Sequence, residues 1–151
     1  MYDASTRLFT LPVTVEFEDI DSYDIVHNTR IIDYFERARV HFLTGVMGLD
    51  LYPAGTGIVL YSLEVRFNKA ARLLDNLDAT VGVASMDEYR LTLSYRLFRK
   101  NEVLARASSG IAFMDTASGN LIAAPAAYRE KIAPYIIYKT STEPSPGNEQ
   151  P

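Results

Sequence analysis

One long amphipathic segment, placed between a single strand-like run and four others, most constrains the fold. From Thr29 onward, apolar side chains recur with a helical period and form one broad stripe: Ile31, Ile32, Phe35, Ala38, Phe42, Leu43 and Val46. Asn28 is a residue type that favours a helix N-cap, and Gly45 and Gly48 mark the end of the pattern. The sequence therefore predicts a helix from about Asn28 to Met47, roughly 30 Å long.

Strand-like segments lie on both sides of this predicted helix. Before it, apolar residues from Val13 to Phe17 alternate with polar ones, which is the pattern of a half-buried strand. After it come four further runs of strand type, at 58–68, 77–86, 89–99 and 103–114. The breaks at Asp87-Glu88 and Lys100-Asn101 are short enough for hairpins, so we expect antiparallel strands.

Five strands and one long helix suggest a simple packing arrangement. The helix can cover one face of a five-stranded sheet if the sheet curls around it. The other face and the edge strands then need partners, which indicates an oligomer. We expect one α+β domain over residues 1–138, with a short helix from Pro125 to Ile132, and a disordered tail over 139–151.

Composition limits the classes of function. The 151 residues carry a net charge of −4, so no basic field favours nucleic acid or an anionic membrane. The absence of cysteine excludes disulfides, thiol nucleophiles and cysteine–metal sites. With two histidines and no glycine-rich phosphate loop, we expect neither a metal nor a cofactor. No apolar run is long enough for a membrane span and no secretion leader stands out, so a cytoplasmic protein is expected.

Carboxylates gather directly ahead of the predicted helix. The run Asp19-Ile20-Asp21-Ser22-Tyr23-Asp24-Ile25-Val26-His27, directly before Asn28, breaks the strand pattern and is expected to form a loop. A helix N-terminus offers unpaired N–H groups and a partial positive charge. A carboxylate beside such a terminus makes a minimal acyl-transfer site, in which the carboxylate attacks or activates water and the N–H groups hold an oxyanion.

The loop and helix resemble those of hotdog-fold acyl-CoA thioesterases, in particular the 4-hydroxybenzoyl-CoA thioesterase-like family. In that family a strand leads into an Asp-x-Asp loop, a glycine-containing turn and a helix with the sequence Tyr-Phe-Glu-x-Ala-Arg. Here Asp19-Ile20-Asp21 and Tyr34-Phe35-Glu36-Arg37-Ala38-Arg39 match without insertion, and the resemblance covers about residues 10–132. It implies a hotdog fold and an enzyme that uses water to hydrolyse a thioester of coenzyme A or of an acyl carrier protein.

The resemblance also assigns roles to single residues. Asp21 matches the catalytic carboxylate of the family, which acts as a nucleophile or as a general base. Asn28 matches the helix-start position whose backbone N–H binds the oxyanion. Asp24 departs from the family, which usually has glycine there, and a glycine lets the backbone approach the substrate closely.

Other side chains are candidates for substrate binding. Tyr23 and Tyr61 are expected to line an acyl pocket, and His27 is expected to lie beside it, either passively or as a proton relay. Cations pair well with phosphates. The cations that could meet the phosphates of coenzyme A are Lys69, Arg72 and Arg90, with a solvated strand edge as the alternative interpretation.

Each carboxylate also has a second interpretation. Asp21 by itself could cap its own turn, and Asp19 is expected to be a solvated or strand-end charge. Glu36 is the alternative catalytic group, because a second thioesterase lineage uses a carboxylate on the central helix. Its simplest role is a charge pair with Arg39 at i, i+3.

Two other functions stay open at this point. One is an enoyl-thioester hydratase or dehydratase on the same fold, in which Asp24 and His27 would form a carboxylate–histidine pair. The other is a protein that binds acyl thioesters without turnover. For the thioesterase we expect a homodimer or homotetramer with the pocket between subunits, because a neighbour's strands would lie against the helix start.

Overall fold

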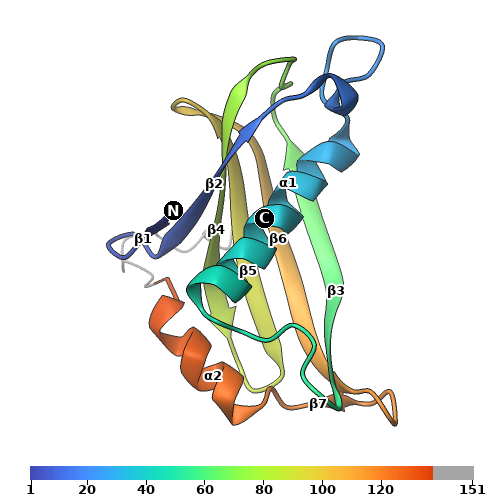
Figure 1. The fold of residues 1–151 in the computed structure, drawn as a ribbon, viewed down its shortest axis with the longest axis vertical. Helices are drawn as coiled ribbons and strands as arrows, with labels where there is room; N and C mark the ends of the chain where they lie inside the picture. Colours follow the sequence, from blue (N-terminus) through green and yellow to red (C-terminus); the bar gives the residue numbers. More distant parts are fainter. Residues whose placement is uncertain (138–151) are drawn as a thin grey trace, which may run out of the picture.

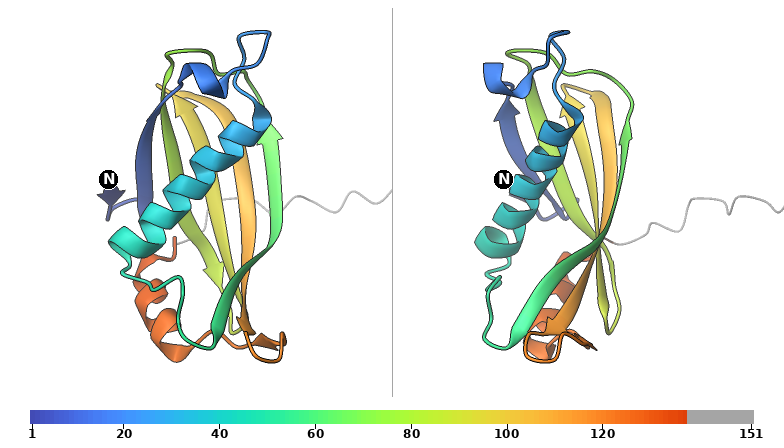
Figure 2. Two further views of the ribbon diagram at one scale, coloured as in Figure 1. Left: turned by 45° about the vertical axis from the view of Figure 1, so that its right-hand side comes forward. Right: turned by 90° about the vertical axis from the view of Figure 1, so that its right-hand side faces the viewer.

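An antiparallel sheet and two helices on one of its faces form the fold. The computed structural model describes residues 1–137, and the tail predicted at 139–151 lies outside them. Helix α1 (Asn28–Val40) runs diagonally across the sheet, as Figures 1 and 2 show. Helix α2 (Ala126–Ile132) packs at the lower end of the sheet in Figure 1 and agrees with the short helix predicted near the end of the domain.

The sheet has more strands than predicted. Its order is β1-β2-β4-β5-β6-β3, with β7 beside β6, and every pairing is antiparallel. The strands are β1 (Tyr2–Asp3), β2 (Leu8–Thr14), β3 (Thr56–Phe67), β4 (Asn76–Met86), β5 (Arg90–Arg99), β6 (Glu102–Asp115) and β7 (Leu121–Ile122). The four runs predicted after the helix are confirmed as β3 to β6. The prediction of five strands in total is wrong, because β1 and β7 are two residues long and too short to produce an alternating pattern.

The helical segment also differs from a single long α-helix. α1 ends at Val40, and His41–Val46 form a π-helical segment. Thr44 Oγ1 donates to the Val40 carbonyl oxygen at 2.7 Å, and the Met47 N–H donates to the Phe42 carbonyl oxygen, with N and O 3.1 Å apart. The helical stretch therefore reaches the predicted end, but its last turn and a half is wider than an α-helix.

The chain leaves the sheet earlier than predicted before α1. β2 stops at Thr14, and Phe17–Asp19 form a 3₁₀ turn in which Phe17 is 79% exposed. The Asp19 Oδ2 atom accepts from the Glu16 N–H at 2.9 Å, while the Asp19 N–H donates to the Glu16 carbonyl at 3.0 Å. These two bonds turn the backbone, so the apparent alternation up to Phe17 does not continue the strand.

The apolar stripe of α1 is buried against the sheet. The buried side chains of α1 are Ile31, Tyr34, Phe35 and Ala38. The Phe35 ring lies 5.3 Å, between centroids, from the Tyr95 ring on β5. Burying one large apolar side chain contributes roughly 1.5–3 kcal/mol, so this stripe holds the helix start firmly at one end of the sheet.

The opposite face of the sheet carries a row of like charges. In β5 the side chains that alternate with the buried Tyr95 and Leu97 point away from α1, as the predicted alternation requires. Arg106 of β6 lies directly opposite Arg96 of β5 on one side and directly opposite Arg66 of β3 on the other. Residues directly opposite share a face of the sheet, and like charges in that arrangement destabilise it.

Candidate active site

The acidic loop is closed at its base by backbone contacts. Ile20 and Val26 form an isolated β-bridge, and the Asp21 N–H donates to the Ile25 carbonyl oxygen at 2.8 Å. The Val26 N–H donates to the carbonyl oxygen of Ala71 at 2.9 Å. The loop is therefore tied to the segment that follows β3, at the end of the sheet where α1 begins (Figure 1).

Asp21 lies inside this loop with one carboxylate oxygen engaged. Its Oδ1 atom accepts from the N–H groups of Tyr23 and Ile25, at 2.8 and 3.2 Å. This is the turn-capping interaction that was one of the two interpretations of Asp21. Within residues 1–137 the Oδ2 atom makes no hydrogen bond, so the turn fixes the carboxylate and leaves one oxygen for chemistry.

The helix start provides unpaired N–H groups next to the loop. His27, not Asn28, occupies the N-cap position, and its carbonyl accepts from the N–H groups of Arg30 and Ile31. The prediction of Asn28 as the cap is thus off by one residue, because Asn28 already has helical geometry. In the part of the chain that the structure describes, the N–H groups of Asn28 and Thr29 have no partner. They are the donors that an oxyanion would meet.

Asp24 keeps the backbone conformation that a glycine would adopt. Its φ of 59° lies in the left-handed region, where Asp is tolerated better than most residues. Its Oδ2 atom lies 3.9 Å from Nη1 of Arg72, and both side chains are exposed. Asp24 therefore has a backbone conformation that is also open to glycine, and its difference from a glycine lies in the exposed carboxylate. Within residues 1–137 no hydrogen bond joins Asp24 to His27.

Asp19 is buried, and the prediction of a solvated charge is wrong. The residue is 6% exposed, and its Oδ2 atom accepts from the Tyr34 hydroxyl at 2.8 Å. Arg30 Nε lies 3.6 Å from the other oxygen, Oδ1. Burial, together with this hydrogen bond to Asp19, raises the pKa of Tyr34. Local sequence gives no signal for the contact, because it forms only when α1 packs against the turn.

Two of the three predicted phosphate-binding cations, Lys69 and Arg72, follow β3 at the end of the sheet where the loop lies, and each contacts a carboxylate. Lys69 Nζ donates to Glu102 Oε1 at 2.6 Å, and Arg72 lies near Asp24 as described above. The contacts with Lys69 and Arg99 hold the pKa of Glu102 below its usual value. Both predicted cations are therefore already partly neutralised within the chain.

Tyr61 and Arg90, two further predicted substrate contacts, come together far from the loop. The register of β3 shifts between Leu60 and Ser62, which leaves Tyr61 as an extra residue. Its ring lies over Gly110, where a Cβ atom would overlap it. The Arg90 Cζ atom lies 5.9 Å from the centroid of the Tyr61 ring.

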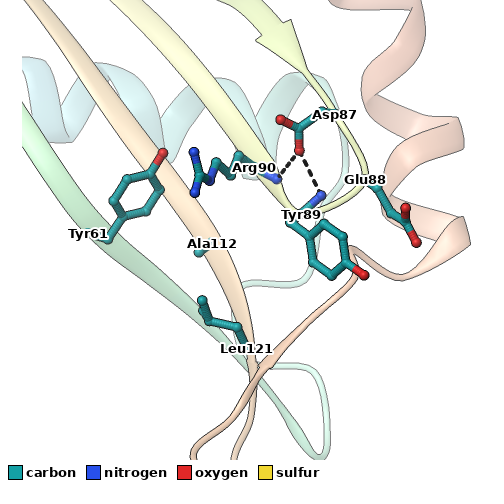
Figure 3. Close-up of a pocket in the computed structure, with 7 residues that line it drawn as sticks. All are labelled: Tyr61, Asp87, Glu88, Tyr89, Arg90, Ala112 and Leu121. Atoms are coloured by element: carbon teal, nitrogen blue, oxygen red, sulfur yellow. Dashed lines mark hydrogen bonds between the residues drawn. The ribbon is translucent and has the colours of Figure 1, made fainter.

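These two side chains border a cavity on the face of the sheet opposite α1. In Figure 3 the helix runs behind the strands and the cavity lies in front of them. The cavity has a volume of about 540 Å³. It is lined by Tyr61, Asp87, Glu88, Tyr89, Arg90, Ala112 and Leu121. The sequence contained one usable signal for it, since a glycine inside a strand pattern often marks a close approach of another group.

The remaining candidates stay at the surface. Tyr23 is 79% exposed at the loop, and its backbone rather than its ring contacts Asp21. Glu36 forms the predicted i, i+3 pair with Arg39, at 3.5 Å. Within one chain Asp21, His27 and Asn28 belong to the loop and the helix start, and Arg72 lies near Asp24 of that loop, whereas Tyr61 and Arg90 border the cavity on the other face of the sheet.

Residues 1–137 contain neither a membrane-spanning helix nor a cluster of metal-binding side chains. None of the helices there has the length and apolar character needed to cross a membrane. No three His, Cys, Asp or Glu side chains in that part of the chain are grouped so that they could hold a metal ion.

Comparison with known families places the loop and helix in context. The family model of the thioesterase-like superfamily matches residues 15–132, which include the loop, both helices and strands β3 to β7. The chain belongs to the thioesterase-like superfamily. The family predicted from the Asp-x-Asp loop, a hotdog-fold thioesterase, is confirmed, and thioester hydrolysis follows as its class of reaction.

Individual relatives of this thioesterase are distant but match most of its length. An acyl-CoA thioesterase YbgC of Haemophilus influenzae is 28% identical over 120 residues, which cover 78% of this chain and 88% of the relative. A crystal structure of a 1,4-dihydroxy-2-naphthoyl-CoA thioesterase from Synechocystis superposes with a TM-score of 0.76 at 17% identity, covering 83% and 96% of the two chains. The structure of YbaW, a probable thioesterase from Escherichia coli, gives a TM-score of 0.72 at 20% identity, covering 85% and 98%. These structures share the fold.

Proposed function

We propose that this thioesterase hydrolyses thioesters of coenzyme A, with Asp21 as the catalytic carboxylate. The observation that carries the proposal is a carboxylate with one oxygen held by its own turn and one oxygen free, in the loop that leads directly into the unpaired N–H groups of Asn28 and Thr29 at the start of α1. The YbgC relatives, named for acyl-CoA thioester hydrolysis, support coenzyme A as the carrier.

The thioester carbonyl oxygen would lie at the start of α1. There the Asn28 N–H would stabilise negative charge on that oxygen, and one such donor is worth roughly 3 kcal/mol in other enzymes. As a general base, Asp21 takes a proton from water, and the hydroxide adds to the carbonyl carbon. The C–S bond then breaks, the acid is released, and the thiolate takes up the proton that Asp21 holds, which returns Asp21 to its ionised form.

Asp21 could instead attack the carbonyl carbon itself. That route forms a mixed anhydride on Asp21 and expels the thiolate, after which water hydrolyses the anhydride. The thiolate needs no strong acid catalyst in either route, since a thiol of pKa about 8.5 is a good leaving group. Glu36 stays the alternative carboxylate, although its pairing with Arg39 makes it less available.

The nucleotide end of coenzyme A is proposed to lie in the cavity between Tyr61 and Arg90. Within residues 1–137 the Arg90 side chain forms no salt bridge, although it interacts electrostatically with the Asp87 carboxylate of the same cavity, whereas Lys69 and Arg72 each lie within 4 Å of a carboxylate oxygen. The aromatic walls of the cavity suit a purine ring, and the guanidinium suits a phosphate.

This arrangement requires a second copy of the chain. The loop contacts Ala71, just beyond one end of β3, whereas Arg90 and Ala112 of the cavity pair near the other end of that strand. β3 is an edge strand, and its exposed apolar side chains are Leu60, Tyr61, Leu63 and Phe67. Antiparallel pairing of two β3 edges would bring the cavity of one copy toward the loop of the other. We therefore propose a homodimer, or a homotetramer of two such dimers.

The hydratase alternative is less well supported. It needs Asp24 and His27 to act as a pair, whereas the Asp24 carboxylate lies toward Arg72. An acyl carrier protein as the thiol carrier, and the cytoplasm as the place of action, stay predictions.

The proposal is tested by measuring free-thiol release from a panel of aromatic and aliphatic acyl-CoAs. The same acyl groups on a carrier protein, and hydration of an enoyl-CoA, are measured in parallel. Turnover of at least one acyl-CoA, without hydration, is the expected result. Binding of acyl-CoA without thiol release would favour the non-catalytic alternative, and hydration of the enoyl-CoA would favour the hydratase.

A further inference from the structure

We infer that Asp19 and Tyr34 act as positioning residues for the reaction. Their hydrogen bond holds the loop that carries Asp21 at a fixed place relative to the start of α1. The inference rests on the proposed role of Asp21, and it assigns a purpose to a buried carboxylate that the chemistry itself does not use.

The side chain of Asp19 joins three separate pieces of the chain. Its Oδ2 atom accepts from the Tyr34 hydroxyl in the second turn of α1 and from the N–H of Glu16 in the preceding turn. Its Oδ1 atom lies 3.6 Å from Arg30 Nε, in the first turn of α1. The carboxylate therefore fixes the incoming chain to the body of the helix.

The backbone of Asp19 fixes the other end of the loop. Its carbonyl oxygen accepts from the His27 N–H at 2.9 Å, and His27 is the N-cap of α1. The next residue, Ile20, bridges to Val26. Asp21 follows Asp19 by two residues. A shift in the contacts of Asp19 and Ile20 would therefore move the Asp21 carboxylate relative to the Asn28 N–H.

A role in stability alone does not explain a charge at this place. The Asp19 side chain is 9% exposed, and a carboxylate in such a position costs free energy unless all its partners are in place. An apolar pair of similar volume is often as stable as a buried charged group. What an apolar pair cannot supply is the directional bonding that connects the turn, the N-cap and the helix body at once.

Tyr34→Phe is the least invasive test, because it removes only the hydroxyl and keeps a ring that is 2% exposed. Small misplacements of a catalytic group can cost large factors in rate, so we expect kcat to fall about 10-fold. KM for the acyl-CoA should change less than about 2-fold, because binding contacts are not touched. Asp19→Asn, which keeps the shape and removes the charge, should lower kcat at least as much.

Tyr128→Phe is the matched control. Tyr128 is also a buried tyrosine, 9% exposed, and its hydroxyl donates to the Asp50 carbonyl oxygen at 2.6 Å. It lies on α2, at the opposite end of the molecule from the loop (Figure 1). We expect this variant to lose a similar amount of stability and to keep its kcat.

A double variant separates positioning from general damage. If Tyr34 acts through Asp21, Tyr34→Phe should cause no further loss in an Asp21→Asn background. The inference would be overturned if the fold-losses of kcat caused by Tyr34→Phe and by Asp21→Asn multiplied in the double variant. It would also be overturned if kcat fell equally in Tyr34→Phe and Tyr128→Phe. An unchanged kcat in both Tyr34→Phe and Asp19→Asn, with Asp21→Asn inactive, would overturn the inference alone. An active Asp21→Asn variant would overturn the role of Asp21 itself, and the inference with it.

Discussion

Replacing Leu63 by lysine is expected to separate the two copies that we propose pair through β3. Leu63 lies on this edge strand and is 39% exposed in the single chain. Fully burying a leucine is worth roughly 1.5–3 kcal/mol, so covering the exposed part contributes about 0.6–1.2 kcal/mol per copy. A symmetric pair loses this twice, and two ammonium groups near the symmetry axis add a penalty of about 1 kcal/mol.

The dimer should therefore weaken by about 2–3 kcal/mol, which corresponds to a roughly 30- to 150-fold higher dissociation constant. Sedimentation velocity over a range of concentrations measures that constant, and thiol release is followed on the same samples. We expect activity to fall in step with the dimer fraction, because the nucleotide cavity is proposed to come from the second copy.

Leu74→Lys is the control for this substitution. Leu74 is 69% exposed and lies in the turn before β4, away from the β3 edge. It should keep both the assembly and the activity. If Leu63→Lys stays as tightly associated and as active as the unaltered protein, the β3 edge is not the interface and the shared-site proposal is wrong.

Three further outcomes are expected. Asp24→Gly should be more stable than Asp24→Ala by about 1 kcal/mol in urea unfolding, because the turn needs a positive φ; equal stabilities would contradict this. Burial raises the pKa values of Tyr34 and Tyr95, so the folded state keeps protons that the unfolded state loses near pH 10. The contribution of these two groups to stability should be constant below that pH and fall above it, and a stability that stays flat from pH 9 to pH 11 would refute the assignment. Arg106→Thr should raise the melting temperature, more at low salt than at high salt, by removing the central charge of the arginine row, and a salt-independent loss of stability would show that the row is compensated.

The strands after the helix could be predicted because their signal is local. Leu91, Leu93 and Leu97 are buried at every second position of β5, and the intervening positions face outward. The position of Asp21 ahead of the helix followed from a motif with a fixed spacing. Both kinds of information are contained in a short stretch of sequence.

Other features depend on contacts between distant segments and could not be predicted. Asp19 resembles a solvated loop charge until α1 packs and places the Tyr34 hydroxyl 2.8 Å from it. The bulge at Tyr61 depends on Gly110, which lies on another strand. The separation of Arg90 from the loop depends on strand order, because hairpin lengths alone do not say which end of the sheet a residue reaches.

The central claim is that Asp21 is the catalytic carboxylate, and its most direct test is the turnover of Asp21→Asn on the best acyl-CoA substrate. Circular dichroism and the melting temperature of the same preparation establish that the variant is folded. The account predicts that kcat falls by about 10²- to 10⁴-fold, the usual contribution of a positioned acid or base. A folded Asp21→Asn enzyme with kcat within about twofold of the unaltered protein would contradict it and direct attention to Glu36.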